Sequence, residues 1–298
     1  MYNGIVNIYK EKGFTSFDVV AKLRGIMKQK KIGHTGTLDP DAVGVLVVCL
    51  GNATKLCELM TEKDKEYEVT MLLGTSTDTE DTSGTIVKTS TIEADEATVR
   101  TVIQSFEKEY DQIPPMYSAI KVHGKRLYEL AREGVSVERQ PRRVTIYSIV
   151  IEEVALPRVV MKVRCSKGTY IRSLCRDIGD ALGCGGCMEQ LVRSRVSGYR
   201  LEDSLTLKQV EELRDAGTLE QVIQPIESMF PQTPKVQTTA KADRYLYNGN
   251  KLNESMLKQA VKAERVLVYD SKQILKGIYD YQEDTNEYVP FKMFLTNE

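Results

Sequence analysis

Hydrophobic and polar positions alternate along much of the first two hundred residues in the way that strands require. Residues 67–73 place apolar side chains at every second position, residues 4–10 do so more weakly, and residues 43–50 are apolar throughout, as in a fully buried strand. Apolar residues at helical spacing separate these runs. Further strands are expected at 85–89, 144–150, 159–165 and 191–196, and further helices at 52–60, at 95–106 and beyond Gly168.

Two helix starts carry a capping box, in which the N-cap side chain and the side chain three residues later satisfy each other's backbone N–H groups. Thr15 and Asp18 form one such pattern, before apolar positions at helical spacing. Thr206 and Gln209 form the other, and that helix is expected to end at Gly217.

The character of the chain changes beyond Pro231. A proline-containing linker leads into short expected strands at 266–269, 274–279 and 291–294, which are typical of a small barrel. The sequence therefore predicts an α+β fold with two domains. We expect residues 1–232 to form a mixed, largely antiparallel central sheet flanked by helices, and residues 233–298 to form a small C-terminal β-barrel.

Charge is balanced overall but segregated along the chain. The net charge of −1 argues against a uniformly basic nucleic-acid coat. Residues 22–31 and 158–176, however, carry only basic charges, and the block at about 115–143 holds seven Lys and Arg against three acids. This segregation suits contact with a polyanion along one side, although solvated helix and strand faces give the same pattern. The basic block also looks like an insertion that projects from the core.

The six cysteines are scattered through apolar or mixed segments, and we expect reduced, mostly buried thiols. Cys184 and Cys187 have the C-x-x-C spacing of metal and redox sites. No second such pair exists, and His34 and His123 lie far away in sequence, so metal and redox chemistry are disfavoured.

No apolar run approaches the roughly 18 residues that span a bilayer, and the first residues do not resemble a signal peptide. We therefore expect a cytoplasmic protein with no membrane partner.

The stretch of residues 33–41 is the strongest candidate for a functional loop. Two glycines bracket His34 and permit close backbone approaches, and Pro40 restricts the backbone of Asp39. The loop would hold Asp39 rigidly at the edge of the apolar strand, as a reactive carboxylate requires. An ordinary turn in which Asp39 hydrogen-bonds its own backbone has the same pattern.

Other common catalytic systems leave no signature in the chain. A P-loop, a dinucleotide-binding fingerprint, an H-E-x-x-H motif and a nucleophile elbow are all absent from the sequence. A carboxylate, aromatic rings and arginines remain. These groups suit covalent or acid–base chemistry on a stacked, polyanionic substrate.

Residues 33–40, with the sequence GHTGTLDP, closely resemble the motif of the TruB family, the bacterial tRNA pseudouridine synthases that modify uridine 55 in the T-loop. The resemblance implies the pseudouridine synthase fold and an isomerase that needs no cofactor. It covers residues 4 to about 200, with further matches in order at 51–55, 65–67, 73–74, 77–81, 114–121 and 165–172.

The resemblance implies three catalytic residues. Asp39 matches the essential aspartate, the proposed nucleophile in cleaving and re-forming the glycosidic link. Arg172 matches the arginine that pairs with this aspartate, and Tyr67 matches the tyrosine that stacks on the flipped base. Spacing alone would place Tyr67 in the core and Arg172 on a solvated helix face.

The resemblance also implies substrate-binding positions. His34 matches the histidine that contacts the target region and helps hold the nucleotide out of the loop, while Tyr170 and Leu191 match pocket-lining positions. The flipped base of a folded loop would stack on Tyr67 and Tyr170, because a base must leave its stack before its glycosidic bond can be reached.

The expected partner is tRNA, bound through its T-stem-loop. The insertion at about 115–143 corresponds to the family's clamp on that stem-loop, and the C-terminal domain resembles a PUA-like RNA-binding barrel. We expect a monomer with no required protein partner. Three alternatives stay open: an RNA-folding chaperone, an RNA-guided pseudouridine synthase within a larger particle, and a glycosidase, which normally needs two spaced carboxylates.

Overall fold

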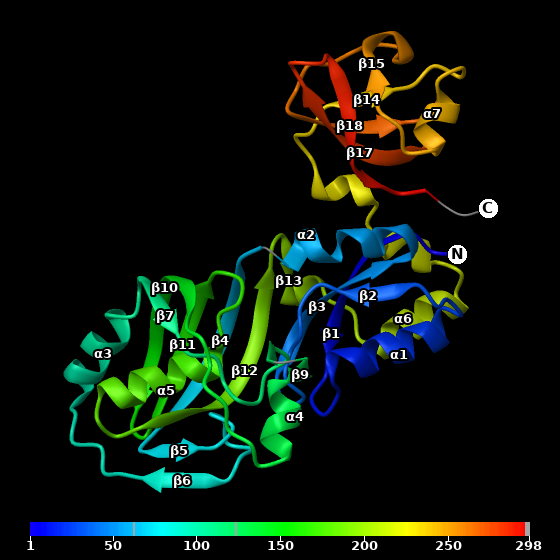
Figure 1. Ribbon diagram of the computed structural model, residues 1–298. Helices are drawn as coiled ribbons and strands as arrows, with labels where there is room; N and C mark the ends of the chain where they lie inside the picture. The colour runs from blue at the N-terminus through cyan, green and yellow to red at the C-terminus, as the bar shows by residue number, and fades with distance from the viewer. Residues whose placement is uncertain (62, 123, 296–298) are drawn as a thin grey trace.

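The computed structural model describes residues 1–61, 63–122 and 124–295. Within these ranges, nine strands form one central sheet (Figure 1). Its pairs are antiparallel except that β12 and β3 run parallel, so the sheet is mixed and largely antiparallel, as predicted. The main path is β1 (Gly4–Lys10), β3 (Val43–Leu50), β12 (Gly186–Val196), β4 (Lys65–Leu73), β11 (Arg158–Cys165), β10 (Arg142–Ala155) and β7 (Glu109–Gln112), with β2 (Ile32–His34) beside β3 and β13 (Tyr199–Arg200) beside β12.

Strand β4 lies in the middle of this sheet and follows the expected alternation throughout. Its odd-numbered residues are buried and its even-numbered residues are half-buried. Strand β12 pairs with one edge of β4 and places Arg193 opposite Tyr67, and Leu191 opposite Val69. Arg193 and Tyr67 are far apart in the sequence, and they become direct neighbours because their strands pair.

Helices cover the sheet in two groups. Helices α3 (Glu96–Gln104) and α5 (Ile171–Ala181) share a core with β4, β10 and β11, and α1 (Ser16–Ile26) and α6 (Leu207–Asp215) share another with β1 and β3 (Figure 1). Both predicted capping boxes are present, at the starts of α1 and α6. Among the described residues, no helix combines the length and apolarity that crossing a bilayer requires.

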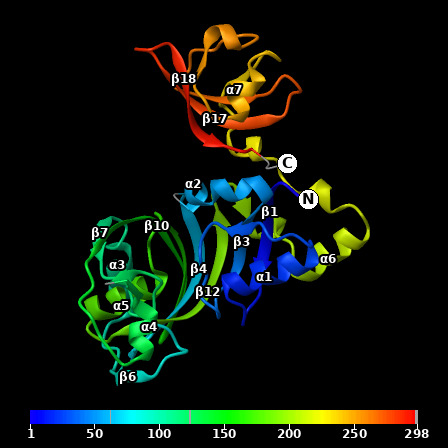
Figure 2. The same cartoon turned by 45° about the vertical axis from the view of Figure 1, so that its right-hand side comes forward.

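A second sheet forms the C-terminal part of the molecule and curls on itself, consistent with a PUA-like domain (Figure 2). It attaches to the 3-10 helix η1 (Gly51–Leu56), where Asn52 Nδ2 donates to Phe294 O at 2.9 Å and Lys55 Nζ donates to Met293 O at 2.8 Å. Its strands, in spatial order, are β14 (Lys235–Gln237), β16 (Arg265–Tyr269), β17 (Leu275–Gln282), β18 (Glu287–Met293) and β15 (Leu252–Asn253).

The segment between β7 and β10 stays outside the central sheet. It contains the short strands β8 (Lys121–Val122) and β9 (Lys125–Arg126), followed by α4 (Leu127–Arg132). Leu127 is buried, and Arg139 Nη1 donates to Pro114 O at 2.9 Å. This hydrogen bond joins the two ends of the segment.

Several boundaries differ from the sequence-based expectations. The helix predicted at 52–60 is divided into η1 and α2 (Cys57–Thr61), and the expected loop after β4 contains β5 (Thr75–Thr77), which pairs with β6 (Ile86–Thr89). Strands β10 and β12 are longer than predicted, and β14, β15 and α7 (Asp243–Tyr247) were not predicted. Strands β14 and β15 and the start of β12 depend on partners distant in sequence, and α7 has only five residues, so none of them leaves a clear local periodicity.

Candidate active site

The loop between β2 and β3 carries Asp39 on a fixed backbone. Leu38 N donates to Ser16 Oγ at 2.9 Å, which ties the loop to the first turn of α1. Ala42 N donates to Asp39 O at 3.1 Å and closes a turn around Pro40. The Asp39 side chain keeps 35% of its surface exposed, so the carboxylate is accessible while its support is held in place.

Two buried cations bind the backbone of this loop. Arg193 on β12 donates from Nη2 to Gly36 O and from Nη1 to Thr37 O, both at 3.2 Å, and from Nε to Val45 O at 2.7 Å. Lys10 on β1 donates from Nζ to Pro40 O at 3.0 Å and to Ala42 O at 2.6 Å. Both side chains are almost fully buried. The loop is therefore clamped on both sides of Asp39.

Gly44 at the start of β3 makes this close packing possible. Its φ of +110° is a conformation that glycine adopts readily, and a Cβ there would lie 2.4 Å from Arg193 O. A larger residue would separate β3 from β12 and move the clamp.

Arg172 on α5 pairs with Asp39 through two bonds. Its Nε lies 2.9 Å from Oδ2, and its Nη2 donates to Oδ1 at 3.1 Å, which is the strong bidentate arrangement. The guanidinium also donates to Thr79 O at 3.0 Å and to Tyr117 O at 2.9 Å. Arg172 is 5% exposed, so the solvated position that spacing alone favoured is wrong. Long-range pairing with Asp39 explains its burial.

Two further acidic residues surround Arg172. Asp81 Oδ2 lies 3.7 Å from Arg172 Nη1, and Glu80, in the left-handed backbone region at φ 63°, turns inward to accept from Ser173 Oγ at 2.6 Å. Glu80 also pairs with Arg176, one helical turn beyond Arg172. The carboxylates thus fix the segment whose Thr79 carbonyl orients Arg172.

The electrostatic balance at Asp39 has opposing contributions. Burial raises the pKa of the Asp39 carboxyl above its ordinary value, and the charge of Asp81 raises it further. Arg172 and Lys10 lower this pKa without overcoming burial. Arg172 therefore favours the ionised carboxylate, as expected, but it lowers the pKa by less than desolvation raises it.

Apolar side chains form the floor of the site. Tyr67 from β4, Leu191 from β12 and Leu38 from the loop belong to one buried cluster, and Tyr67 and Leu191 are each 7% exposed. Burial raises the pKa of the Tyr67 hydroxyl to about 12, while the Arg193 charge opposes that rise. Tyr67 is therefore neutral at ordinary pH.

Tyr170 and His34 lie at the edges of the site. Tyr170 precedes α5 and is fixed by Gln112, whose Oε1 accepts from Tyr170 N at 2.8 Å and whose Nε2 donates to Tyr170 O at 3.1 Å. His34 ends β2, where burial lowers its pKa and the Arg193 charge lowers it further, which favours the neutral ring.

The structure thus joins Asp39 to Arg172 directly and places Tyr67 and Leu191 in one buried cluster with Leu38, the neighbour of Asp39. Tyr170 directly precedes the helix that carries Arg172, and His34 ends the strand that leads into the loop of Asp39. Sequence reasoning missed Arg193 and Lys10. Neither residue forms a sequence motif with the residues that it contacts. The one feature that could have indicated their burial is that each is a charged residue in a largely apolar strand.

The cysteines are all unpaired thiols, and five of the six are buried, as expected. Within the described ranges, no group of three or more His, Cys, Asp and Glu side chains could hold a metal ion. His123, the second histidine of the chain, lies outside the described residues.

Comparisons with protein families match most of the chain. Residues 24–171 match the model described as TruB family pseudouridylate synthase (N terminal domain), and residues 172–231 match the tRNA pseudouridylate synthase B C-terminal domain. The two matches meet directly before Arg172, so the candidate site is divided between them.

Curated relatives resemble the chain over nearly its whole length. The tRNA pseudouridine synthase B of Lachnoclostridium phytofermentans is 55% identical, with 98% of this chain and 100% of that protein covered. The protein of the same name from Halalkalibacterium halodurans is 42% identical, with 99% and 98% covered.

Solved structures share the fold at lower identity. A Cbf5-Nop10-Gar1 complex includes a chain that is 28% identical with a TM-score of 0.72, and 98% of this chain and 85% of that one are covered. An H/ACA RNP bound to a substrate RNA containing 2'-deoxyuridine gives 25% identity and a TM-score of 0.70, with 99% and 86% covered.

Proposed function

The chain belongs to the TruB family of pseudouridylate synthases, isomerases whose curated members are named for action on tRNA, and within that family we propose that it converts uridine 55 of the T-loop to pseudouridine. The observation that carries the proposal is the bidentate pair between Arg172 and Asp39, held on a clamped loop above an apolar floor.

Asp39 acts on the target nucleotide as a nucleophile. Pseudouridine formation breaks the C1′–N1 bond and makes a C1′–C5 bond, while C5 loses a proton and N1 gains one, so no atom is added or lost overall. A carboxylate that adds to the nucleotide and is later expelled divides this exchange into two easier steps. Arg172 holds the carboxylate in one orientation through both of its oxygens.

The remaining residues receive the flipped base. Tyr67 and Leu191 belong to the buried cluster that contains Leu38, the neighbour of Asp39, and Tyr170 directly precedes the helix of Arg172. Stacking of a base on an aromatic side chain is worth about 1–3 kcal/mol. His34 occupies the rim and helps keep the base out of the loop. The neutral ring expected from its lowered pKa suits contact with uncharged groups of RNA.

The two separate sheets support a division of the chain into two domains. Residues 1–232 form the catalytic domain, residues 233–298 form the PUA-like RNA-binding domain, and the insertion at about 115–143 clamps the stem-loop. The hydrogen bond from Arg172 to Tyr117 O supports the clamp, because it connects that insertion to the catalytic pair. The enzyme works in the cytoplasm as a monomer on free tRNA.

The test is turnover of unmodified tRNA by the purified protein, with mass-spectrometric location of pseudouridine. Wild type should modify uridine 55, and Asp39→Asn should lose at least ~10³-fold in rate while still binding tRNA. Asp41→Asn is the matched control, since Asp41 is a solvent-exposed carboxylate two residues away, 3.9 Å from Lys12. It should keep wild-type activity.

The alternatives give different results. Tight binding with no isomerisation by wild type would support the chaperone. Activity that depends on an added guide RNA would support an RNA-guided enzyme. Full activity in Asp39→Asn would remove Asp39 from the mechanism.

A further inference from the structure

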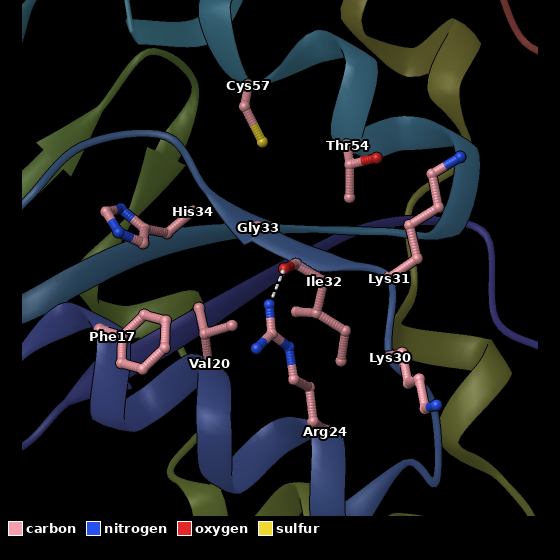
Figure 3. A pocket seen from close by; sticks show the side chains of 10 residues that line it. All are labelled: Phe17, Val20, Arg24, Lys30, Lys31, Ile32, Gly33, His34, Thr54 and Cys57. Carbon is pink, nitrogen blue, oxygen red and sulfur yellow. Dashed lines mark hydrogen bonds between the residues drawn. The ribbon is translucent and has the colours of Figure 1, made fainter.

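A hollow lies beside the catalytic loop, on the side of His34 that faces α1. Its volume is about 490 Å³, within the range of small-molecule sites. Figure 3 shows residues from α1, from β2 and the segment leading into it, from η1 and from the start of α2 around it. Its lining is Phe17, Val20, Arg24, Lys30, Lys31, Ile32, Gly33, His34, Thr54 and Cys57.

The charges in this hollow are all positive. Arg24, Lys30 and Lys31 line it without any Asp or Glu. Among the described residues, none of the three forms an ion pair. Arg24 uses Nη2 to donate to Ile32 O at 3.3 Å, while its Nε is buried without a hydrogen-bond partner. Lys31 Nζ donates to Asn52 Oδ1 at 3.3 Å. The described residues therefore supply no acidic counter-charge for these three cations.

A second hollow on the other side of α1 provides a comparison. It has a similar volume of about 460 Å³, but Glu11 and Glu211 line it together with its cations. Arg214 there pairs with Glu211 at 3.2 Å and with Asp215 at 2.6 Å, and Lys208 lies 3.8 Å from Glu212. Helix α1 therefore separates a hollow lined by three cations and two acids from one lined by three cations and no acid, and Gly33 and His34 of the 33–41 stretch line the latter.

An exposed aromatic ring adds a stacking surface to the cationic hollow. Phe17 is 63% exposed, an unusual state for a phenylalanine in the first turn of a packed helix. The Arg24 guanidinium lies 5.8 Å from its ring centroid, and the His34 ring lies on the same side of the hollow (Figure 3). A planar apolar surface next to cations has the chemistry that recognises a nucleotide.

We propose that this hollow binds a nucleotide of the T-loop that flanks the flipped uridine, with its base on Phe17 and its phosphate among Arg24, Lys30 and Lys31. The inference rests on the proposed function, because it names a second part of the same RNA. His34 and Asp39 are five residues apart, so their backbones lie within about 17 Å of each other. A short run of nucleotides spans that distance.

The electrostatic part is tested with an isolated T-stem-loop RNA. The triple variant Arg24→Gln, Lys30→Gln, Lys31→Gln should raise Kd and KM about 10- to 100-fold and leave kcat within about twofold, because the hollow binds without touching the reacting bond. The slope of log K against log salt should fall by ~0.7 for each phosphate that the variant no longer neutralises. The matched control, Lys22→Gln with Lys208→Gln, removes two charges from the other hollow and should leave these values unchanged.

The stacking part is tested with a double-mutant cycle. RNAs with an abasic nucleotide at each position flanking the target are titrated against wild type and Phe17→Ala. At one position, removal of the base should weaken wild-type binding about 5- to 150-fold, the range of ~1–3 kcal/mol at ~1.4 kcal/mol per tenfold. The same removal should have little further effect in Phe17→Ala.

Failure of this inference differs from failure of the proposed function. The inference alone is overturned if wild type isomerises uridine 55 but the binding results show no role for the hollow. In that case the triple variant has the Kd and salt slope of wild type, and the effects of Phe17→Ala and of the abasic nucleotides are additive. Wild type that forms no pseudouridine overturns the proposed function, whereas the binding assays still report on the hollow. Equal competition by free uridine monophosphate would assign the hollow to mononucleotides and overturn the flanking-nucleotide role.

Discussion

Two walls of the candidate active site each present a buried arginine, and the two arginines bind different kinds of acceptor. Arg172, on the α5 wall, pairs with the Asp39 carboxylate and lies near that of Asp81. Arg193, on the β12 wall, donates to three backbone carbonyls and, among the described residues, pairs with no carboxylate. Both are almost fully buried.

The difference separates two tasks within one site. A guanidinium on a carboxylate sets the charge and orientation of that carboxylate, whereas a guanidinium on carbonyls fixes the backbone that carries it. We therefore expect changes at Arg172 to act mainly on rate and changes at Arg193 to act mainly on stability. The predictions below test this division, from the largest effect to the smallest.

Arg172→Met should lower kcat by about 10²–10³-fold, comparable to the removal of a preorganised electrostatic partner elsewhere. Arg172→Lys should recover only part of the loss, because lysine cannot form the bidentate pair. Single-turnover rates on saturating tRNA measure both variants. A kcat within threefold of wild type in Arg172→Met would remove Arg172 from the catalytic role.

Arg193→Met should lower the free energy of unfolding by about 2–4 kcal/mol, because it leaves the Gly36, Thr37 and Val45 carbonyls without their donor. Urea titration measures this loss. Arg195→Met is the matched control on the same strand, where the surface pair with Glu66 is worth up to ~1 kcal/mol. If Arg193→Met lowered kcat without lowering the free energy of unfolding, both arginines would act on the reaction and the proposed division of tasks would be wrong.

The acid side of the pH–rate profile should report Asp39. Its raised pKa means that the carboxylate becomes protonated, and activity falls, at a higher pH than for an ordinary aspartate. Asp81→Asn removes a negative charge that raises this pKa, so the fall should move to lower pH. A shift to higher pH, or none, would contradict the proposed electrostatic balance.

Lys10 should make the stability of the protein depend on pH in the alkaline range. Burial lowers its pKa from 10.5 to about 8, so between these values the unfolded chain holds a proton that the folded chain has lost. The free energy of unfolding then rises with pH across that interval. Urea titrations between pH 7.5 and 10 should show a shallower rise in Lys10→Met than in wild type. Parallel curves would indicate that Lys10 does not titrate there.

The sequence by itself determined much of the local architecture. Alternation in residues 67–73 predicted β4 and the burial of Tyr67, and the capping boxes predicted the starts of α1 and α6. These features depend on residues within one turn or one strand of each other, so a local pattern records them. The resemblance carried by residues 33–40 led to the family, which the comparisons show.

Only the tertiary structure decided how the site is assembled. Arg172 and Asp39 are separated by 133 residues, and Arg193 and Gly36 by 157. Neither pair leaves any periodicity in the chain, and a lone arginine in a strand or on a helix face normally remains in solvent. These arginines are buried because sheet pairing and helix packing bring distant carbonyls and carboxylates to them. Hydrophobic pattern therefore determined which segments fold, and long-range polar pairing determined where the Asp39 carboxylate is held.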